Sequence, residues 1–186
     1  MELHNDLLDL AIRLAAPPAS ALVSAPLAGA AVAPPTAAAI AVPPIPPISE
    51  AESRRAISTA YYALFHLLIH ASTTRGVGTA ALRPYVARNF EHRSMLAICK
   101  KYAGLAIDTA GQPVSLEIQR IAGAFVQLQN ARHKADYNVK DTVTPAEAQI
   151  FVQMARDAFT DWGAAAANPA ADVYLTELLV GGVKER

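Results

Sequence analysis

The feature that most constrains the fold is a long helical pattern that begins after a capping box at residues 49–52. Ser49 can accept a hydrogen bond from the backbone of Glu52, and the Glu52 side chain can reach back to the backbone of Ser49. A helix is predicted from there to about Ser72. Its apolar face holds Ile57, Ala60, Tyr61, Leu64, Phe65 and Leu68, and Tyr62 and Ile69 extend it around the cylinder. A helix apolar on most sides is typical of the centre of a bundle or of a contact with a second subunit.

Helical periodicity recurs along the chain, and no strand-like alternation of useful length interrupts it. Thr144 and Glu147 form a second capping box with Pro145 at the first helical position, which predicts another helix start. The predicted helices are 2–15, 50–72, 79–90, which is kinked or restarted near Pro84, 93–103, 115–138, 145–162 and 169–180. We therefore predict an all-α fold, an antiparallel (up-and-down) helical bundle that forms a single domain over residues 1–186.

An Ala/Pro-rich, low-complexity insert separates the first two predicted helices. We assign it to residues 17–48 and expect a flexible linker, because a structureless connection of this length is uncommon inside a compact domain. Residues 19–42 carry no charge, but Pro26, Pro34 and Pro35 interrupt them and most of their apolar content is small alanine. Such a segment is a poor membrane span, so we expect no membrane partner.

Composition limits how this chain could meet nucleic acid. Lysine plus arginine number 16 and aspartate plus glutamate also 16, so the formal net charge is zero. Binding to RNA would therefore depend on a local patch rather than on a global field. Cys99 is the only cysteine, which excludes an internal disulfide and fits a reducing compartment. With the acidic start at Glu2 and Asp6, this predicts a cytoplasmic location.

Arg132 is the main anomaly of the pattern. The helix predicted over 115–138 has a heptad-like apolar stripe through Ile118, Ile121, Phe125 and Leu128, and Arg132 occupies the next position on it. A guanidinium on a core stripe is costly unless it is paired or faces water. Asp136 lies four residues further on and can reach it. Two interpretations stay open: an internal ion pair, or a phosphate-binding arginine held by its neighbour.

Two segments resemble the HEPN family of small helical domains. Residues 54–66, RRAISTAYYALFH, are similar to the second-helix signature of that family, and residues 131–137, ARHKADY, to the Arg-x-x-Ala-Asp-Tyr element of one of its branches. The resemblance covers most of the chain outside residues 17–48. It implies an antiparallel HEPN-like bundle, commonly dimeric, found beside nucleotidyltransferases and in toxin–antitoxin pairs.

The resemblance also implies a chemistry. Active members cleave RNA without a metal ion, using an arginine followed after four to six residues by a histidine. In this chain Tyr137 and Asn138 stand where that histidine is expected after Arg132. A tyrosine with a pKa near 10 is a poor base at neutral pH.

The candidate residues follow from these patterns. The catalytic candidates are Arg132, Tyr137 and His92; the candidates for binding a phosphate or another ligand are Arg132, Asp136, Arg54, Arg55 and His133. The alternative for Arg54 and Arg55 is an ordinary exposed pair with Glu50 and Glu52. His66 and His70 have half of a metal-site spacing, but no third ligand is indicated, and we expect neither metal nor cofactor.

Three functions remain open from the sequence. The leading hypothesis is a homodimeric HEPN-like module that binds RNA or a nucleotide, or another protein, with a nucleotidyltransferase as a candidate partner. The alternative is an active metal-independent ribonuclease in which Tyr137, His92 or His133 replaces the usual histidine. The third is a purely structural helical scaffold.

Overall fold

The computed structural model of the chain describes residues 2–16 and 48–181, and within these ranges it is all-helical. The elements in chain order are α1 (Leu3–Ala15), α2 (Glu50–Gly76), the 3₁₀ turn η1 (Ala80–Leu82), α3 (Arg83–Ala87), α4 (His92–Tyr102), α5 (Leu116–Tyr137), α6 (Pro145–Ala165) and α7 (Pro169–Gly181). The all-α prediction is confirmed. The predicted linker, except for its last residue Ile48, lies outside the described residues.

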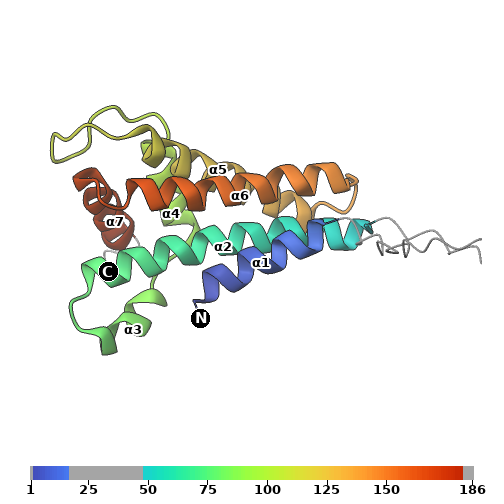
Figure 1. The fold of residues 1–186 in the computed structure, drawn as a ribbon, viewed down its shortest axis with the longest axis horizontal. Helices are drawn as coiled ribbons and strands as arrows, with labels where there is room; N and C mark the ends of the chain where they lie inside the picture. The colour runs from blue at the N-terminus through green and yellow to red at the C-terminus, as the bar shows by residue number, and fades with distance from the viewer. Residues whose placement is uncertain (1, 17–47, 182–186) are drawn as a thin grey trace, which may run out of the picture.

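Helices α1, α2, α5 and α6 form the antiparallel part of the bundle. In Figure 1, α1 and α5 run in one direction, α2 and α6 run in the other, and α4 crosses them at a steep angle. Residues of α1, α2, α4, α5, α6 and α7 share one hydrophobic core. The up-and-down arrangement expected from the sequence is therefore present.

Helix α2 lies at the centre and begins as predicted. The Ser49 hydroxyl accepts from the backbone N–H of Glu52 at 3.2 Å, and the Ser49 N–H donates to the Glu52 carboxylate at 2.8 Å. Sixteen of the 27 residues of α2 are buried. Two of its buried hydroxyls are satisfied within the helix: Thr59 and Thr73 donate to the carbonyls four residues earlier at 2.7 and 2.8 Å.

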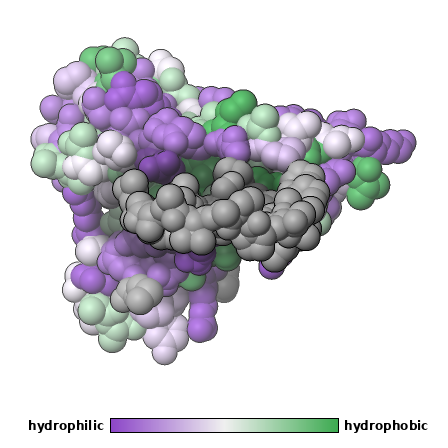
Figure 2. Space-filling view, turned by 45° about the vertical axis from the view of Figure 1, so that its right-hand side comes forward, coloured by the Kyte–Doolittle hydropathy of each residue, from purple (hydrophilic) through white to green (hydrophobic). Residues whose placement is uncertain are grey.

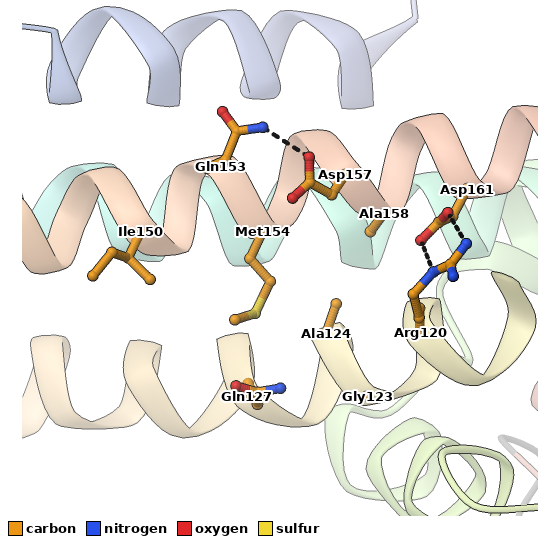
Figure 3. Close-up of a pocket in the computed structure, with 10 residues that line it drawn as sticks. All are labelled: Arg120, Gly123, Ala124, Gln127, Ile150, Gln153, Met154, Asp157, Ala158 and Asp161. Atoms are coloured by element: carbon orange, nitrogen blue, oxygen red, sulfur yellow. Dashed lines mark hydrogen bonds and ion pairs between the residues drawn. The ribbon is translucent and has the colours of Figure 1, made fainter. Parts of the chain in front are cut away.

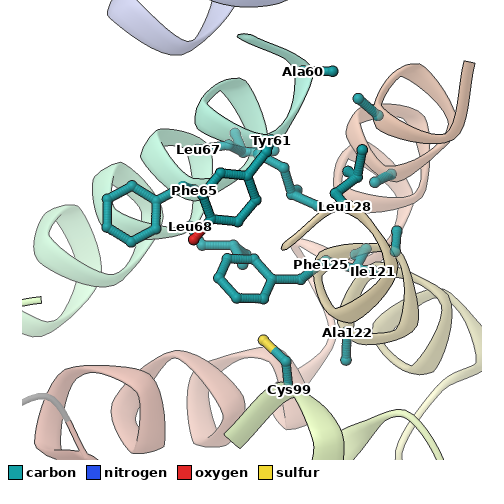
Figure 4. Packing of buried hydrophobic residues seen from close by; sticks show 14 of the residues in the cluster. Ala60, Tyr61, Phe65, Leu67, Leu68, Cys99, Ile121, Ala122, Phe125 and Leu128 are labelled. Atoms are coloured by element: carbon teal, nitrogen blue, oxygen red, sulfur yellow. The ribbon is translucent and has the colours of Figure 1, made fainter. Parts of the chain in front are cut away.

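The contact between α2 and α5 forms the middle of the core. Figure 4 shows Tyr61 and Phe65 of α2 facing Phe125 of α5, with Cys99 of α4 below them. The ring centroids of Tyr61 and Phe125 are 5.5 Å apart, a normal separation for packed aromatic rings. This contact fixes which side of α5 faces α2, and therefore where Arg132 lies.

The region between α2 and α4 takes one of the two predicted forms. A helix kinked or restarted near Pro84 was expected over residues 79–90, and the chain forms η1 and then restarts as the five-residue α3, with Pro84 in its first turn. Pro84 has no backbone N–H to donate, so it fits a helix start better than a helix interior. No helix of the described ranges is both long enough and apolar enough to cross a membrane.

Two leucines of α5 test the assignment of its buried face. Leu128 is fully buried and Leu116 is 65% exposed. We expect Leu128→Ala to lower the free energy of unfolding by about 2–5 kcal/mol, because it removes buried apolar surface and leaves a cavity. Leu116→Ala, the same change on the same helix, should cost about 0.5 kcal/mol or less. Urea denaturation of both variants measures this, and equal losses would contradict the packing of α5.

Candidate functional site

Arg132 lies at the seam between α5 and α2, with its side chain 18% exposed. Its Nε is 2.6 Å from Oδ2 of Asp136, and its Nη2 donates to the hydroxyl of Tyr62 at 2.9 Å. The contact with Asp136 is an ion pair by distance, although the Nε–H does not point along it as a hydrogen bond requires. The predicted pairing with Asp136 is confirmed, and the same guanidinium reaches the surface of the seam.

Aromatic rings surround this guanidinium. Its Cζ lies 5.5 Å from the ring centroids of both Tyr62 and Tyr137 and 6.0 Å from that of Tyr61. These distances are within the range of cation–π attraction. Burial by itself lowers the pKa of Arg132, but the neighbouring Tyr62 and Asp136 outweigh it and hold the pKa above its ordinary value. The side chain is therefore a permanent cation.

Asp136 links the two helices. Its Oδ1 accepts a short hydrogen bond from the hydroxyl of Ser58, which is buried on α2, while its Oδ2 meets Arg132. The carboxylate is thus held from two sides and in turn orients the guanidinium. Ser58 lies in the HEPN-like segment, but nothing in the sequence pattern indicated this contact.

His92, the first residue of α4, comes to the same place from a different helix. Its Nδ1 and the Tyr61 hydroxyl form a hydrogen bond of 2.6 Å, and its ring centroid lies 6.0 Å from that of Tyr62 and 4.3 Å from that of Phe65. Burial lowers the pKa of His92, and the charge of Arg132 lowers it further. His92 is therefore neutral near pH 7, and its Nε2 has no hydrogen-bond partner among the described residues.

Tyr137 and His133 form the outer part of the site. The Tyr137 side chain is 64% exposed, and its ring centroid lies 5.0 Å from that of His133, one helical turn earlier. Tyr137 thus stands between Arg132 and His133. The structure therefore brings Arg132, Asp136, Tyr137 and His92 together and leaves His133 at the edge.

Arg54 binds the C-terminal end of α5, and its guanidinium does not join the group around Arg132. Its Nη1 donates to the carbonyls of Ala135 and Asn138 at 2.8 and 3.0 Å, at the C-terminal end of α5. Its Nη2 lies 2.7 Å from Glu50, the pair that the spacing predicted. These bonds satisfy carbonyls that a helix end leaves without a partner. With its donors engaged in this way, Arg54 is not placed to bind phosphate as predicted.

Arg55 is exposed, and the pairing expected for it is not seen. The Glu52 carboxylate is used by the capping box, and no ion pair of Arg55 occurs within the described part of the chain. Arg55 therefore remains a candidate for ligand binding, separate from the seam.

The remaining histidines gather at the start of α1. Glu2 lies 2.9 Å from Nε2 of His4 and 3.2 Å from Nε2 of His70, and His66 lines the same hollow. Burial lowers the pKa values of His4 and His66. Among the described residues, no group of three or more histidine, cysteine or acidic side chains has an arrangement suited to a metal ion.

A larger groove of about 520 Å³ lies between α5 and α6. Figure 3 shows Ile150 and Met154 on one side, Ala124 on the other, and the pair of Arg120 with Asp161 at one end. Its lining is largely apolar and its charged groups are paired with each other or with amides, so it offers no reactive group. Outside its grey atoms, the face in Figure 2 is mostly hydrophilic, with hydrophobic residues in small groups.

Fold and site together define an all-α bundle with an aromatic-lined arginine at a helix seam. No family model, curated protein or solved structure matches this chain.

Substitutions of Arg54 and Arg55 test whether Arg54 stabilises the C-terminal end of α5. Arg54→Ala should lower the free energy of unfolding by about 1–3 kcal/mol, because it leaves carbonyls at the end of α5 without their charged donor. Arg55→Ala, one residue further on and exposed, should change it by about 0.5 kcal/mol or less. Chemical denaturation gives both values, and a neutral Arg54→Ala would show that the contacts are dispensable.

Proposed function

We propose that this chain is a HEPN-like module that binds the phosphate groups of RNA or of a nucleotide through Arg132. The observation that carries the proposal is the placement of this guanidinium. It is fixed by Asp136 and Tyr62 through Nε and Nη2, and its Nη1 makes no hydrogen bond to any described residue. An oriented arginine with unused donors at a partly exposed seam suits a phosphate oxygen.

The electrostatics favour a weak, local contact. The net charge of the chain is zero, and Asp136 offsets part of the charge of Arg132. One site of this kind neutralises only about one or two phosphates, so we expect a shallow dependence of affinity on salt. A dimer that brings two such seams together would double the local charge.

The wider assignment rests on the resemblance of residues 54–66 and 131–137. As in that family, we propose a homodimer, a cytoplasmic location and a nucleotidyltransferase as candidate partner in a toxin–antitoxin arrangement. Tyr137, which contacts Arg132, is 64% exposed, and Val139, in the same hollow as Tyr137, is 86% exposed. Such side chains also suit a protein-interaction module, which is a separate hypothesis from phosphate binding.

Fluorescence anisotropy with a labelled single-stranded RNA, in the presence of a chelator, tests the phosphate contact. Arg132→Ala should weaken binding about ten- to hundredfold, because a hydrogen bond to a charged group contributes about 1.5–3 kcal/mol. The RNA affinity of Arg132→Lys should lie between those of the wild type and Arg132→Ala, because lysine keeps the charge and loses the planar fork of donors.

Arg120→Ala is the matched control, because Arg120 lies on the same helix, is more exposed and pairs with Asp161 away from the seam. It should leave the affinity unchanged. Helical circular dichroism shows whether each variant is folded. Folded Arg132 variants that bind as tightly as the wild type would rule the proposal out.

A metal-independent ribonuclease is the second candidate, and the position of His92 favours it. His92 of α4 shares Tyr61 and Tyr62 with Arg132, so it could take the role of the histidine that the HEPN resemblance leads us to expect five to seven residues after Arg132. With its proton on Nδ1, His92 could accept the proton of a ribose 2′-hydroxyl at Nε2. The 2′-oxygen would then attack phosphorus, giving a 2′,3′-cyclic phosphate and a 5′-hydroxyl that takes its proton from water or Tyr137.

The pH profile of RNA cleavage in chelator tests this role. Only neutral His92 accepts a proton, and its pKa lies below 6.5, so the rate should reach a plateau above about pH 6.5 and fall below it. His92→Gln and Arg132→Ala should each lower the rate at least about a hundredfold. His70→Gln, at a histidine that pairs with Glu2 beside α1 and lies outside the seam, is the control. Equal cleavage by all of these proteins would indicate a contaminating nuclease and remove the ribonuclease hypothesis.

A further inference from the structure

A hollow of about 430 Å³ lies at the C-terminal end of α5 and shares Tyr137 with the surroundings of Arg132. It is lined by Asn130, His133, Tyr137, Val139 and Lys140 among others. We infer that this hollow binds one unpaired adenine base of the RNA or nucleotide whose phosphate contacts Arg132. The inference rests on the proposed function and adds to it a base and a sequence preference.

Tyr137 supplies a stacking surface. Its side chain is 64% exposed, and the guanidinium of Arg132 lies 5.5 Å from the centroid of its ring. A phosphate on Arg132 and a base on Tyr137 would therefore belong to the same or adjacent nucleotides. Stacking of a base on an aromatic side chain strengthens binding by about tenfold or more.

His133 and Val139 close the hollow around that ring. The ring of His133 is tilted by 52° to that of Tyr137, so the two rings form an angled wall instead of a closed stack. Val139 is 86% exposed in the same hollow. Exposed apolar and aromatic groups lose water when a flat base covers them, which favours binding.

Asn130 is the residue from which we expect a preference for adenine. It is exposed, and its side-chain amide makes no hydrogen bond within the described residues. The side-chain amide of asparagine places an NH2 donor beside a carbonyl acceptor. This arrangement matches the N7 acceptor and the N6 donor on one edge of adenine. Asn138 cannot take this role, because its amide donates to Asp141 at 2.8 Å and accepts from the backbone of Lys140 at 3.1 Å.

The charges at the rim suit a nucleotide. Lys134 lies 3.5 Å from Glu147, whereas Lys140 is exposed and forms no ion pair with any described residue. Lys140 can therefore meet the phosphate that follows the bound base. The hollow thus combines an aromatic surface, a free amide and a cation beside a phosphate site.

Anisotropy measurements with short oligomers of A, of U and of abasic nucleotides separate the base from the phosphate. The wild type should bind the A oligomer about tenfold more tightly than the abasic one, and the U oligomer between them. Tyr137→Leu should remove most of the advantage of A, and Tyr137→Phe should keep it. Asn130→Ala should make A and U equal while leaving the abasic affinity unchanged.

The outcomes distinguish this inference from the proposed function. Arg132→Ala should weaken all three oligomers, the abasic one included. If the wild type binds A, U and abasic oligomers equally and Arg132 is still required, the adenine pocket is wrong and the phosphate site stands. If Arg132→Ala changes no affinity, or if no oligomer binds to the folded wild type, both are wrong.

Discussion

Burial of helix α2 on nearly every side is the constraint on which the other helices depend. Its apolar residues extend around the cylinder, so α1, α5, α6 and α7 have to cover it together. Alanines such as Ala56 and Ala60, fully buried, let the neighbours approach closely without leaving gaps. Two of its buried hydroxyls, those of Thr59 and Thr73, bond to the helix itself, so these polar groups do not compete with packing.

The seam between α2 and α5 is where this packed core gives way to a polar site. Tyr61 faces Phe125 in the core, and the next residue, Tyr62, points far enough around the helix to meet Arg132. Ser58, one turn earlier, holds Asp136. One turn of α2 therefore supports both the hydrophobic contact and the orientation of the cation, and Arg54 secures the end of α5 that carries it.

The features that depend on residues close together in the chain were predicted correctly. The capping boxes at Ser49 and Thr144 form as their spacing indicated, because each depends on residues three apart in the chain. The ion pair of Arg132 with Asp136 follows in the same way from a spacing of four. The sequence did not decide the structure of residues 79–90, because Pro84 is compatible with either a kink within one helix or the start of a new helix. The hydrogen bond of Arg54 to the end of α5 joins residues more than eighty positions apart, so no local sequence pattern predicted it.

The sequence by itself determined that the chain is helical, where its principal helices begin, and that one arginine interrupts an apolar stripe. These properties depend on periodicity, capping and spacing within single helices. Only the tertiary structure decided what surrounds that arginine: Tyr62 and Ser58 come from α2, and His92 comes from α4. The physical reason is that the packing of α4 and α5 against α2 sets these contacts, and packing depends on all helices at once.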